Sequence, residues 1–174
     1  MRAAQSAARV NQPGADGPFQ RILLASEGRP IPDAAIARVL ELAAKSGASV
    51  RVFSLARVHG VSFGMPNPGL LPTKAEWKEQ RELVAKAVKR LKRKGIEADG
   101  HVVGTRKSTK RICEEATLAG CEAIVMAADP DRNRIIGDML WSQEPQRVRR
   151  RAKLPVYLVP DVSDGSDGSA GSAG

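Results

Sequence analysis

The stretch "IVMAADPDRNRIIGDMLWSQEP", residues 124–145, holds the side chains whose types and spacing could do chemistry. It begins like a buried strand that leads into a phosphate-binding loop, yet Gly137 is its one glycine. Glycines suit such loops because backbone N–H groups then approach an anion without a Cβ in the way. Arginines in the loop could donate to phosphate instead, but an ion-pair network with neighbouring carboxylates is the favoured interpretation. The arginines are Arg132 and Arg134, and the carboxylates are those of Asp129, Asp131 and Asp138.

No other cluster of reactive side chains accompanies this loop. Cys113 and Cys121 lack the CxxC spacing of metal and redox motifs, so both are predicted to be buried as small hydrophobic residues. His59 and His101 stand apart in the sequence, and neither is assigned a role. Without a Ser/His/Asp set or a metal-ligand cluster, the sequence predicts no metal and no enzymatic activity, with slow ATP hydrolysis as the open alternative.

The composition suits one globular domain with a single core, since 42% of the 174 residues are hydrophobic. The 28 basic residues outnumber the 19 acidic ones, and the formal net charge is +9. Such an excess can attract nucleic acid or another polyanion, but solvated helix faces give the same total and are the favoured interpretation. Nucleic acid is the less favoured partner because aromatic residues make up only 3% of the chain. The basic residues crowd two segments, at Lys86, Lys89, Arg90, Lys92, Arg93 and Lys94 and at Arg147, Arg149, Arg150, Arg151 and Lys153.

Short apolar runs alternate with amphipathic segments along the chain. A Thr73–Glu76 capping box opens the second helix, Ser108 is predicted to cap the third, and the fourth should begin near Ser142. A long loop is expected over residues 59–72, where glycine and proline are frequent. Strands are predicted over residues 19–26, 49–58, 96–104, 123–128 and 155–160. The predicted inward faces comprise Ile36, Val39, Leu40 and Ala43 in the first helix and Trp77, Val84, Ala87, Val88 and Leu91 in the second.

Strands that alternate with helices indicate βαβ units, whose right-handed crossovers place helices on both faces of a parallel sheet. Ligands bind such sheets beyond the carboxyl ends of the strands, where the strand order reverses. The sequence therefore predicts an α/β domain at residues 19–160 with its site at the loops after the first and fourth strands. A disordered leader is expected at 1–18 and a disordered Gly/Ser/Asp tail at 161–174. No membrane span and no secretory signal are evident, so a cytoplasmic protein is expected.

Three segments, in this order, resemble the universal stress protein (UspA) family. "ILLASEG" is similar to that family's first strand, which usually ends in V-D-G-S, and "CEAIVMA" is similar to its fourth strand, A-D-L-I-V-M-G. "RRRAKLPVYLV" is similar to its closing helix and strand, R-x-A-P-C-P-V-L-V-V. The resemblance spans residues 19–160 and implies a Rossmann-like open parallel sheet of five strands in the order 3-2-1-4-5, with helices on both faces. It also implies a role in the stress response.

The resemblance places a nucleotide motif directly after the fourth strand. Family members that bind ATP carry G-x2-G-x9-G-[ST] there, and the last helix presents its N-terminus to the phosphates. At the matching positions this chain has Ala127, Pro130 and, with one extra residue in the loop, Trp141, and only Ser142 retains the hydroxyl. Pro130 has no N–H to donate. The motif is therefore degenerate and no cofactor is expected, with ATP or another adenine nucleotide as the alternative.

Further residues complete this vestigial or weak nucleotide site. The family's acidic residue that contacts the nucleoside matches Glu27, which is one methylene longer than the usual Asp. Leu55 and Met126 could wall an adenine ring, although ordinary core packing is the favoured role for both. The complete predicted set is Glu27, Leu55, Met126, Ala127, Pro130, Arg132 and Ser142.

The favoured hypothesis is a non-catalytic stress-response or regulatory protein that works by dimerisation and partner binding. The alternatives are an atypical adenine-nucleotide-binding member of the family and a basic module that binds nucleic acid or an acidic partner. Homodimerisation is predicted at the last strand, because an apolar sheet edge framed by two prolines suits pairing with a second copy. This edge consists of Val156, Tyr157, Leu158 and Val159. Domains of the resembled family also attach to transporters and kinases, so docking on such a protein is a further expectation.

Overall fold

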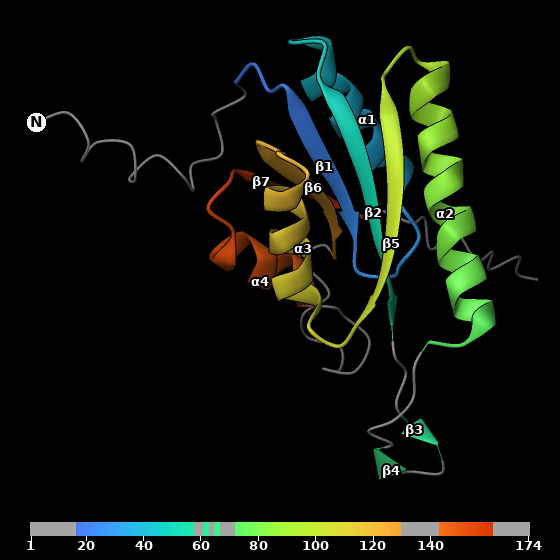
Figure 1. Cartoon of the computed structure of the whole chain (residues 1–174). Helices are drawn as coiled ribbons and strands as arrows, with labels where there is room; N and C mark the ends of the chain where they lie inside the picture. The colour runs from blue at the N-terminus through green and yellow to red at the C-terminus, as the bar shows by residue number, and fades with distance from the viewer. Residues whose placement is uncertain (1–16, 58–60, 63–64, 67–71, 130–142, 162–174) are drawn as a thin grey trace, which may run out of the picture.

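The computed structural model describes residues 17–57, 61–62, 65–66, 72–129 and 143–161. They form a five-stranded parallel sheet in the order β5-β2-β1-β6-β7 and a small antiparallel pair, β3-β4 (Figure 1). Along the five-stranded sheet this is the order 3-2-1-4-5, so the predicted fold class is confirmed. The strands are β1 (Arg21–Ser26), β2 (Ser49–Arg57), β3 (Val61–Ser62), β4 (Met65–Pro66), β5 (Ala98–Thr105), β6 (Ala123–Ala128) and β7 (Val156–Pro160). The helices are α1 (Asp33–Ala44), α2 (Lys74–Arg93), α3 (Ser108–Leu118) and α4 (Glu144–Arg151).

Helices cover both faces of the five-stranded sheet. The core residues of α1 and α2 pack on one face, and those of α3 and α4 pack on the other (Figure 1). Right-handed crossovers give this arrangement, because β2 and β5 extend the sheet to one side of β1 whereas β6 and β7 extend it to the other. The central strands are buried on both faces, which explains why "RILLAS" and "AIVMAA" are nearly continuous apolar runs.

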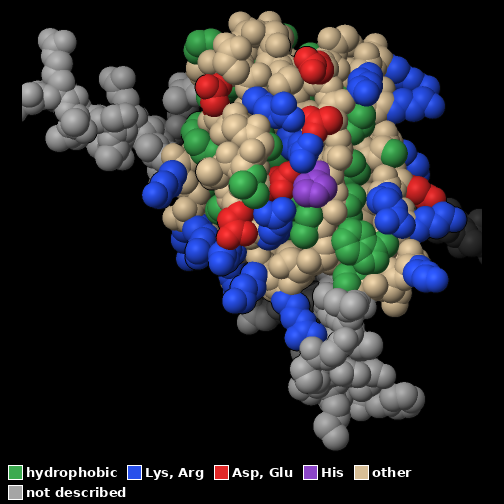
Figure 2. All heavy atoms as spheres, viewed as in Figure 1, with side chains coloured by type: hydrophobic (Ala, Val, Ile, Leu, Met, Phe, Trp, Pro, Cys, Tyr) green, Lys and Arg blue, Asp and Glu red, His purple; other side chains and the backbone are tan. Residues whose placement is uncertain are grey.

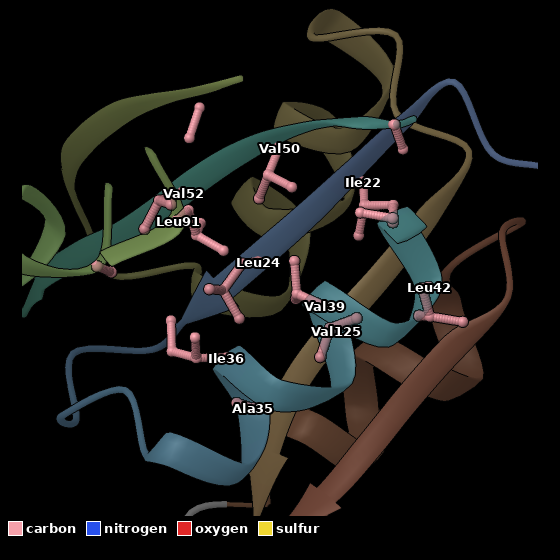
Figure 3. Packing of buried hydrophobic residues seen from close by; sticks show 14 of the residues in the cluster. Ile22, Leu24, Ala35, Ile36, Val39, Leu42, Val50, Val52, Leu91 and Val125 are labelled. Carbon is pink, nitrogen blue, oxygen red and sulfur yellow. The ribbon is translucent and has the colours of Figure 1, made fainter. Parts of the chain in front are cut away.

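The core beneath α1 shows how the central strands are held. Ile22 and Leu24 of β1 lie beside Val39 and Leu42 of α1 and Val125 of β6 (Figure 3). None of these five side chains has exposed surface. Burying each of them contributes roughly 1.5 to 3 kcal/mol, so this packing of α1 on β1 and β6 is a substantial part of what holds the sheet together.

The helix faces differ from the predicted ones at particular positions. In α1 Leu42 is fully buried, whereas Leu40 is only half-buried at the margin of the core. The other predicted residues of this face, Ile36, Val39 and Ala43, are buried as expected, so the structure adds Leu42 to the face and places Leu40 at its margin. In α2 the polar Gln80 is buried in line with Val84 and Leu91, a position that the apolar pattern did not indicate.

The helix starts confirm one predicted cap and correct another. Thr73 Oγ1 accepts a hydrogen bond from Glu76 N at 3.2 Å, and Thr73 N donates to Glu76 Oε2 at 2.6 Å, which is the predicted capping box. The prediction that Ser108 caps α3 was wrong, because Ser108 is the first helical residue and Lys107 holds the cap position without a side-chain bond. Lys107 N donates instead to Thr105 Oγ1 at 3.0 Å. The helix begins at Ser108, one residue earlier than it would if Ser108 were the cap.

The predictions for the two cysteines, for the loop at 59–72 and for the two ends of the chain have different outcomes. Cys121 is buried as predicted, and burial raises the pKa of its thiol to about 11, whereas Cys113 is only half-buried. The expected loop at 59–72 contains the short β3-β4 ladder. The leader at 1–18 and the tail at 161–174 lie almost wholly outside the described residues, and their disorder stays a prediction.

A buried carboxylate joins α3 to the sheet. The Glu115 side chain is 3% exposed, and its Oε1 lies 2.9 Å from His101 Nδ1 and 3.1 Å from Arg51 Nε. Its Oε2 accepts a hydrogen bond from Arg111 at 3.1 Å. Burial would raise the pKa of Glu115, but the hydrogen bonds from His101 and Arg51 outweigh it and hold the pKa below its usual value. His101 therefore has a structural role, which the sequence did not indicate.

We expect Glu115→Gln to lower the free energy of unfolding by about 1.5 to 3 kcal/mol near neutral pH, because charged hydrogen bonds become neutral ones. The pKa of Glu115 is lowered by folding, so the stability that its carboxylate contributes is present above the unfolded-state pKa. That contribution is lost as the pH falls through the folded-state pKa. Urea denaturation of parent and variant at about pH 7 and about pH 3 should show the difference shrink in acid.

The matched control for this prediction is Glu114→Gln, which removes a carboxylate from the same helix. Glu114 is 46% exposed and pairs with Lys110 at 3.5 Å, so its loss should change stability by less than about 0.5 kcal/mol at either pH. A Glu115→Gln penalty that stays equally large in acid would contradict the assigned role.

Candidate functional site

The strand order reverses between β1 and β6, and we call this place the switch point. β1 pairs with β2 on one side and with β6 on the other, and Ala25 is in register with Met126 near the two carboxyl ends. Open parallel sheets bind ligands in the crevice outside such a reversal. The described residues at the switch point are the turn 26–29, which begins at the last residue of β1, and Asp129, which follows β6.

The loop after β1 is a tight turn held by its own side chains and by α2. Gly28 has a φ of 107°, which glycine adopts without the strain that a side chain would bring. Gly28 N donates to Ser26 Oγ at 3.1 Å, and that hydroxyl donates to Arg29 O at 2.6 Å. Gln80 Nε2 donates to Gly28 O at 3.1 Å, and Gln80 Oε1 accepts from Ser54 Oγ at 2.7 Å. A chain of polar contacts therefore runs from β2 through α2 to the switch point.

Arg29 connects the ends of β1 and β6. Its Nε donates to Glu27 Oε1 at 2.6 Å, and its two terminal nitrogens donate to the two oxygens of Asp129 at 2.8 and 3.2 Å. The side chains of Arg29, Glu27 and Asp129 are 18%, 2% and 16% exposed. Burial would lower the pKa of Arg29, but the hydrogen bond to Asp129 and the charges of both carboxylates raise it overall. The guanidinium is thus a permanent cation fixed between two carboxylates.

The predicted site residues separate into three groups. Glu27 lies at the switch point, where it was predicted, and is 1% exposed. Leu55 and Met126 have no exposed surface and pack in one core cluster, which is the role that sequence analysis favoured for them. Ala127 is buried within β6 in register with Val159. Pro130, Arg132 and Ser142 lie outside the described residues, as do Arg134, Gly137 and Trp141, so their roles stay predictions.

Sequence analysis did not name Arg29, and it assigned Asp129 other ion-pair partners. Asp129 was considered with the arginines of its own loop, whereas its described partner comes from the loop after β1. A signal was available, because the predicted strand order places the ends of the first and fourth strands side by side. Opposite charges directly after both strands, in "SEGR" and "AAD", indicate a contact across the switch point.

A second feature lies along the edge strand β7. A groove of about 560 Å³ follows this strand between α1 and α4. The Tyr157 ring meets the Phe19 ring edge-on at 6.2 Å, and the Arg38 guanidinium lies over Tyr157 at 4.9 Å. The predicted edge residues Val156, Tyr157, Leu158 and Val159 are all half-buried and all line the groove.

Among the described residues neither a metal-binding cluster nor a membrane-spanning helix is found. None of their His, Cys, Asp and Glu side chains form a group of three or more that could hold a metal ion. The helices among them include none that is both long and apolar enough to cross a membrane. The expected cytoplasmic location stays a prediction.

The arrangement of sheet, helices and switch point agrees with a known family. The model of the family described as "Universal stress protein family" matches residues 18–160. The chain belongs to the universal stress protein family. No protein with a curated description matches the chain in sequence.

Solved structures of universal stress proteins have the same fold. A family protein from Burkholderia pseudomallei is 24% identical with a TM-score of 0.60, covering 85% of this chain and 99% of its own. A universal stress protein from Archaeoglobus fulgidus in complex with dAMP is 19% identical with a TM-score of 0.59, covering 82% and 99%. A universal stress protein solved in complex with cAMP is 19% identical with a TM-score of 0.57, covering 83% of this chain and 98% of its own. At these identities the likeness establishes the fold.

We expect Gln80→Met to lower the free energy of unfolding of this universal stress protein by about 1 to 3 kcal/mol, because Ser54 and the Gly28 carbonyl both lose a buried partner. Ser54→Ala alone should cost about 0.5 to 1.5 kcal/mol. The double variant should lose at least about 0.5 kcal/mol less than the sum of the single losses, as measured by urea denaturation. Additive losses would show that the two residues do not form one polar chain.

Proposed function

We propose that this member of the family is non-catalytic and regulatory, and that it acts through dimerisation and partner binding without holding ATP. The carrying observation is the charge at the switch point. Glu27 and Asp129 place two carboxylates there, and Arg29 supplies one positive charge against them. The described charges of this cluster sum to −1, so the cluster does not attract a nucleotide's phosphates.

The matched nucleotide motif supports the same proposal. Ala127 takes the place of its first glycine, and Pro130 replaces the second with a residue that has no N–H. The dAMP and cAMP complexes of other family members support the alternative, an atypical adenine-nucleotide-binding protein. The two hypotheses differ in the affinity that they require for nucleotide.

Calorimetric titration should show no ATP binding with a dissociation constant below about 10 µM, which corresponds to roughly −7 kcal/mol. The physical reason is the net negative charge of the described cluster of Glu27, Arg29 and Asp129, together with the lost backbone donors. Stoichiometric binding tighter than this limit would refute the proposal. Glu27→Ala and Ser142→Ala would then show whether the nucleotide uses the predicted site, because removing a charged hydrogen-bond partner costs roughly 1.5 to 3 kcal/mol of affinity.

The open edge of β7 supports dimerisation. The Pro155 carbonyl accepts from Ile124 N, and Asp161 N donates to the Ala128 carbonyl, so alternate residues of β7 face β6. The N–H groups of Val156 and Leu158 consequently face away from β6. Two prolines frame these residues and limit the free ladder to a short stretch, which suits pairing across a two-fold axis better than open-ended association.

Sedimentation at tens of micromolar should give a mass about twice 18.6 kDa. A charge placed at Val156 or Leu158 should shift the protein towards monomer. Leu158→Pro gives a second test, since it removes an outward N–H that an edge strand does not need within one subunit. Circular dichroism should confirm that each variant folds. A monomeric parent would refute the dimer. A dimer that none of these substitutions weakens would show that the interface lies elsewhere.

The basic surface favours a second candidate function, the binding of an acidic partner. Lys and Arg side chains gather over α3 and α4 on the face shown in Figure 2. On α4 they are exposed, and the described residues include no ion pair to Arg149, Arg150 or Arg151. We rank this candidate second because exposed arginines on a solvated helix face need no partner.

A further inference from the structure

β5 forms the edge of the five-stranded sheet opposite to β7, and it lies beside α2 (Figure 1). Val50 N donates to the Glu97 carbonyl at 2.8 Å, so the odd-numbered residues of β5 bond to β2. The N–H and C=O groups of Gly100, Val102 and Gly104 consequently point away from the sheet. Among the residues that the structure describes, none bonds to these outward groups.

This edge lacks the features with which proteins usually keep an edge strand from pairing. Its eight residues include no lysine and no proline. Its register with β2 runs without interruption from Ala98 to Thr105, so no bulge turns the edge away. The charge of Asp99 is already compensated by ion pairs with Arg21 and Arg51. The edge is therefore open to a further strand.

We propose that β5 pairs with the β5 of a second copy, antiparallel and across a two-fold axis, in a contact that is independent of the one at β7. The charges at the two ends of the strand favour this occupant. Glu97 precedes β5 and Lys107 follows it, both are exposed, and neither has an ion pair among the described residues. A two-fold axis brings opposite ends of the two strands together, so each Glu97 meets the partner's Lys107.

The same charges select the register of the pairing. With Val102 on the two-fold axis, Glu97 lies opposite the partner's Lys107. Residues equally far from Val102 on the two strands then lie opposite each other, so outward backbone groups meet, as the hydrogen-bonded pairs of an antiparallel ladder require. With His101 on the axis, Glu97 would lie opposite the partner's Thr105 and the charge contact would be lost.

The flank of α2 beside β5 supports the same register. A Cβ added at Gly104 would lie 3.0 Å from Trp77, and one added at Gly100 would overlap Val84 and touch Val88, so both glycines keep α2 close to the edge. Trp77 and Val88 are only half-buried within one subunit. Because Gly100 lies opposite the partner's Gly104 in this register, each Trp77 comes beside the partner's Val88. Burial of this apolar surface stabilises the pairing.

Sedimentation of a variant with a blocked β7 edge tests the contact by itself. Leu158→Pro should be monomeric at about 20 µM, and its mass should rise towards twice 18.6 kDa at about 500 µM, because a contact below the standard area of about 1,600 Å² is weak. Adding Val102→Pro should keep the protein monomeric, since this substitution removes an outward N–H and no bond to β2. Circular dichroism should confirm that each variant folds.

Charge reversal tests the register without a change in the backbone. In the Leu158→Pro background, Lys107→Glu should weaken the association about tenfold, because the two-fold axis repeats the lost attraction and the new repulsion. Combining Lys107→Glu with Glu97→Lys should restore the association. Lys89→Glu is the matched control, since it makes the same change of charge in the groove between α1 and α2 and should have little effect.

A Leu158→Pro variant that stays monomeric at about 500 µM would overturn the proposal. So would an association that Val102→Pro or the charge reversal leaves unchanged. The outcomes also separate this contact from the dimer of the proposed function. A Leu158→Pro variant that is as dimeric as the parent, and that Val102→Pro makes monomeric, would refute the β7 dimer and support the β5 contact.

Discussion

The parallel pairing of β1 with β6 is the contact on which the rest of the structure depends. It lies where the chain, having extended the sheet through β2 and β5, returns to the other side of β1. The pairing buries both central strands on two faces and so fixes the main core. It also brings the loops after two distant strands together, and these loops carry Glu27, Arg29 and Asp129. The chemistry at the switch point is therefore a product of strand order.

The fold could be predicted from the sequence because its signals are local. Apolar runs indicate buried strands, and glycines, prolines and the Thr73 capping box indicate where helices begin and end. Individual predictions were wrong where neighbouring residues have the same local chemistry. Ser108 has the chemistry of a helix cap, but the Thr105 hydroxyl satisfies the preceding turn and α3 starts one residue earlier. A cap residue and a first-turn residue are hard to distinguish without that contact.

The candidate site was less predictable because its contacts are tertiary. Glu27 could be placed at the switch point by resemblance and by strand order. Its engagement with Arg29 depends on the conformation of the turn, and the further contact with Asp129 joins residues 100 positions apart. The charge clusters around Glu115 and around Arg29 also connect different parts of the fold. Glu115 attaches a helix to the sheet, whereas Arg29 joins two strand ends that a ligand would need to approach.

The position of β1 has a consequence for how the chain is made. β1 can pair with β2 soon after both have been synthesised, but its other edge waits for β6, about a hundred residues later. Pairing between strands so far apart in sequence slows folding, and an unpaired apolar edge is open to association with other chains in the meantime. The crevice is thus among the last parts of the sheet to be completed. Until β6 has emerged from the ribosome, the nascent chain contains a partial sheet and no switch point.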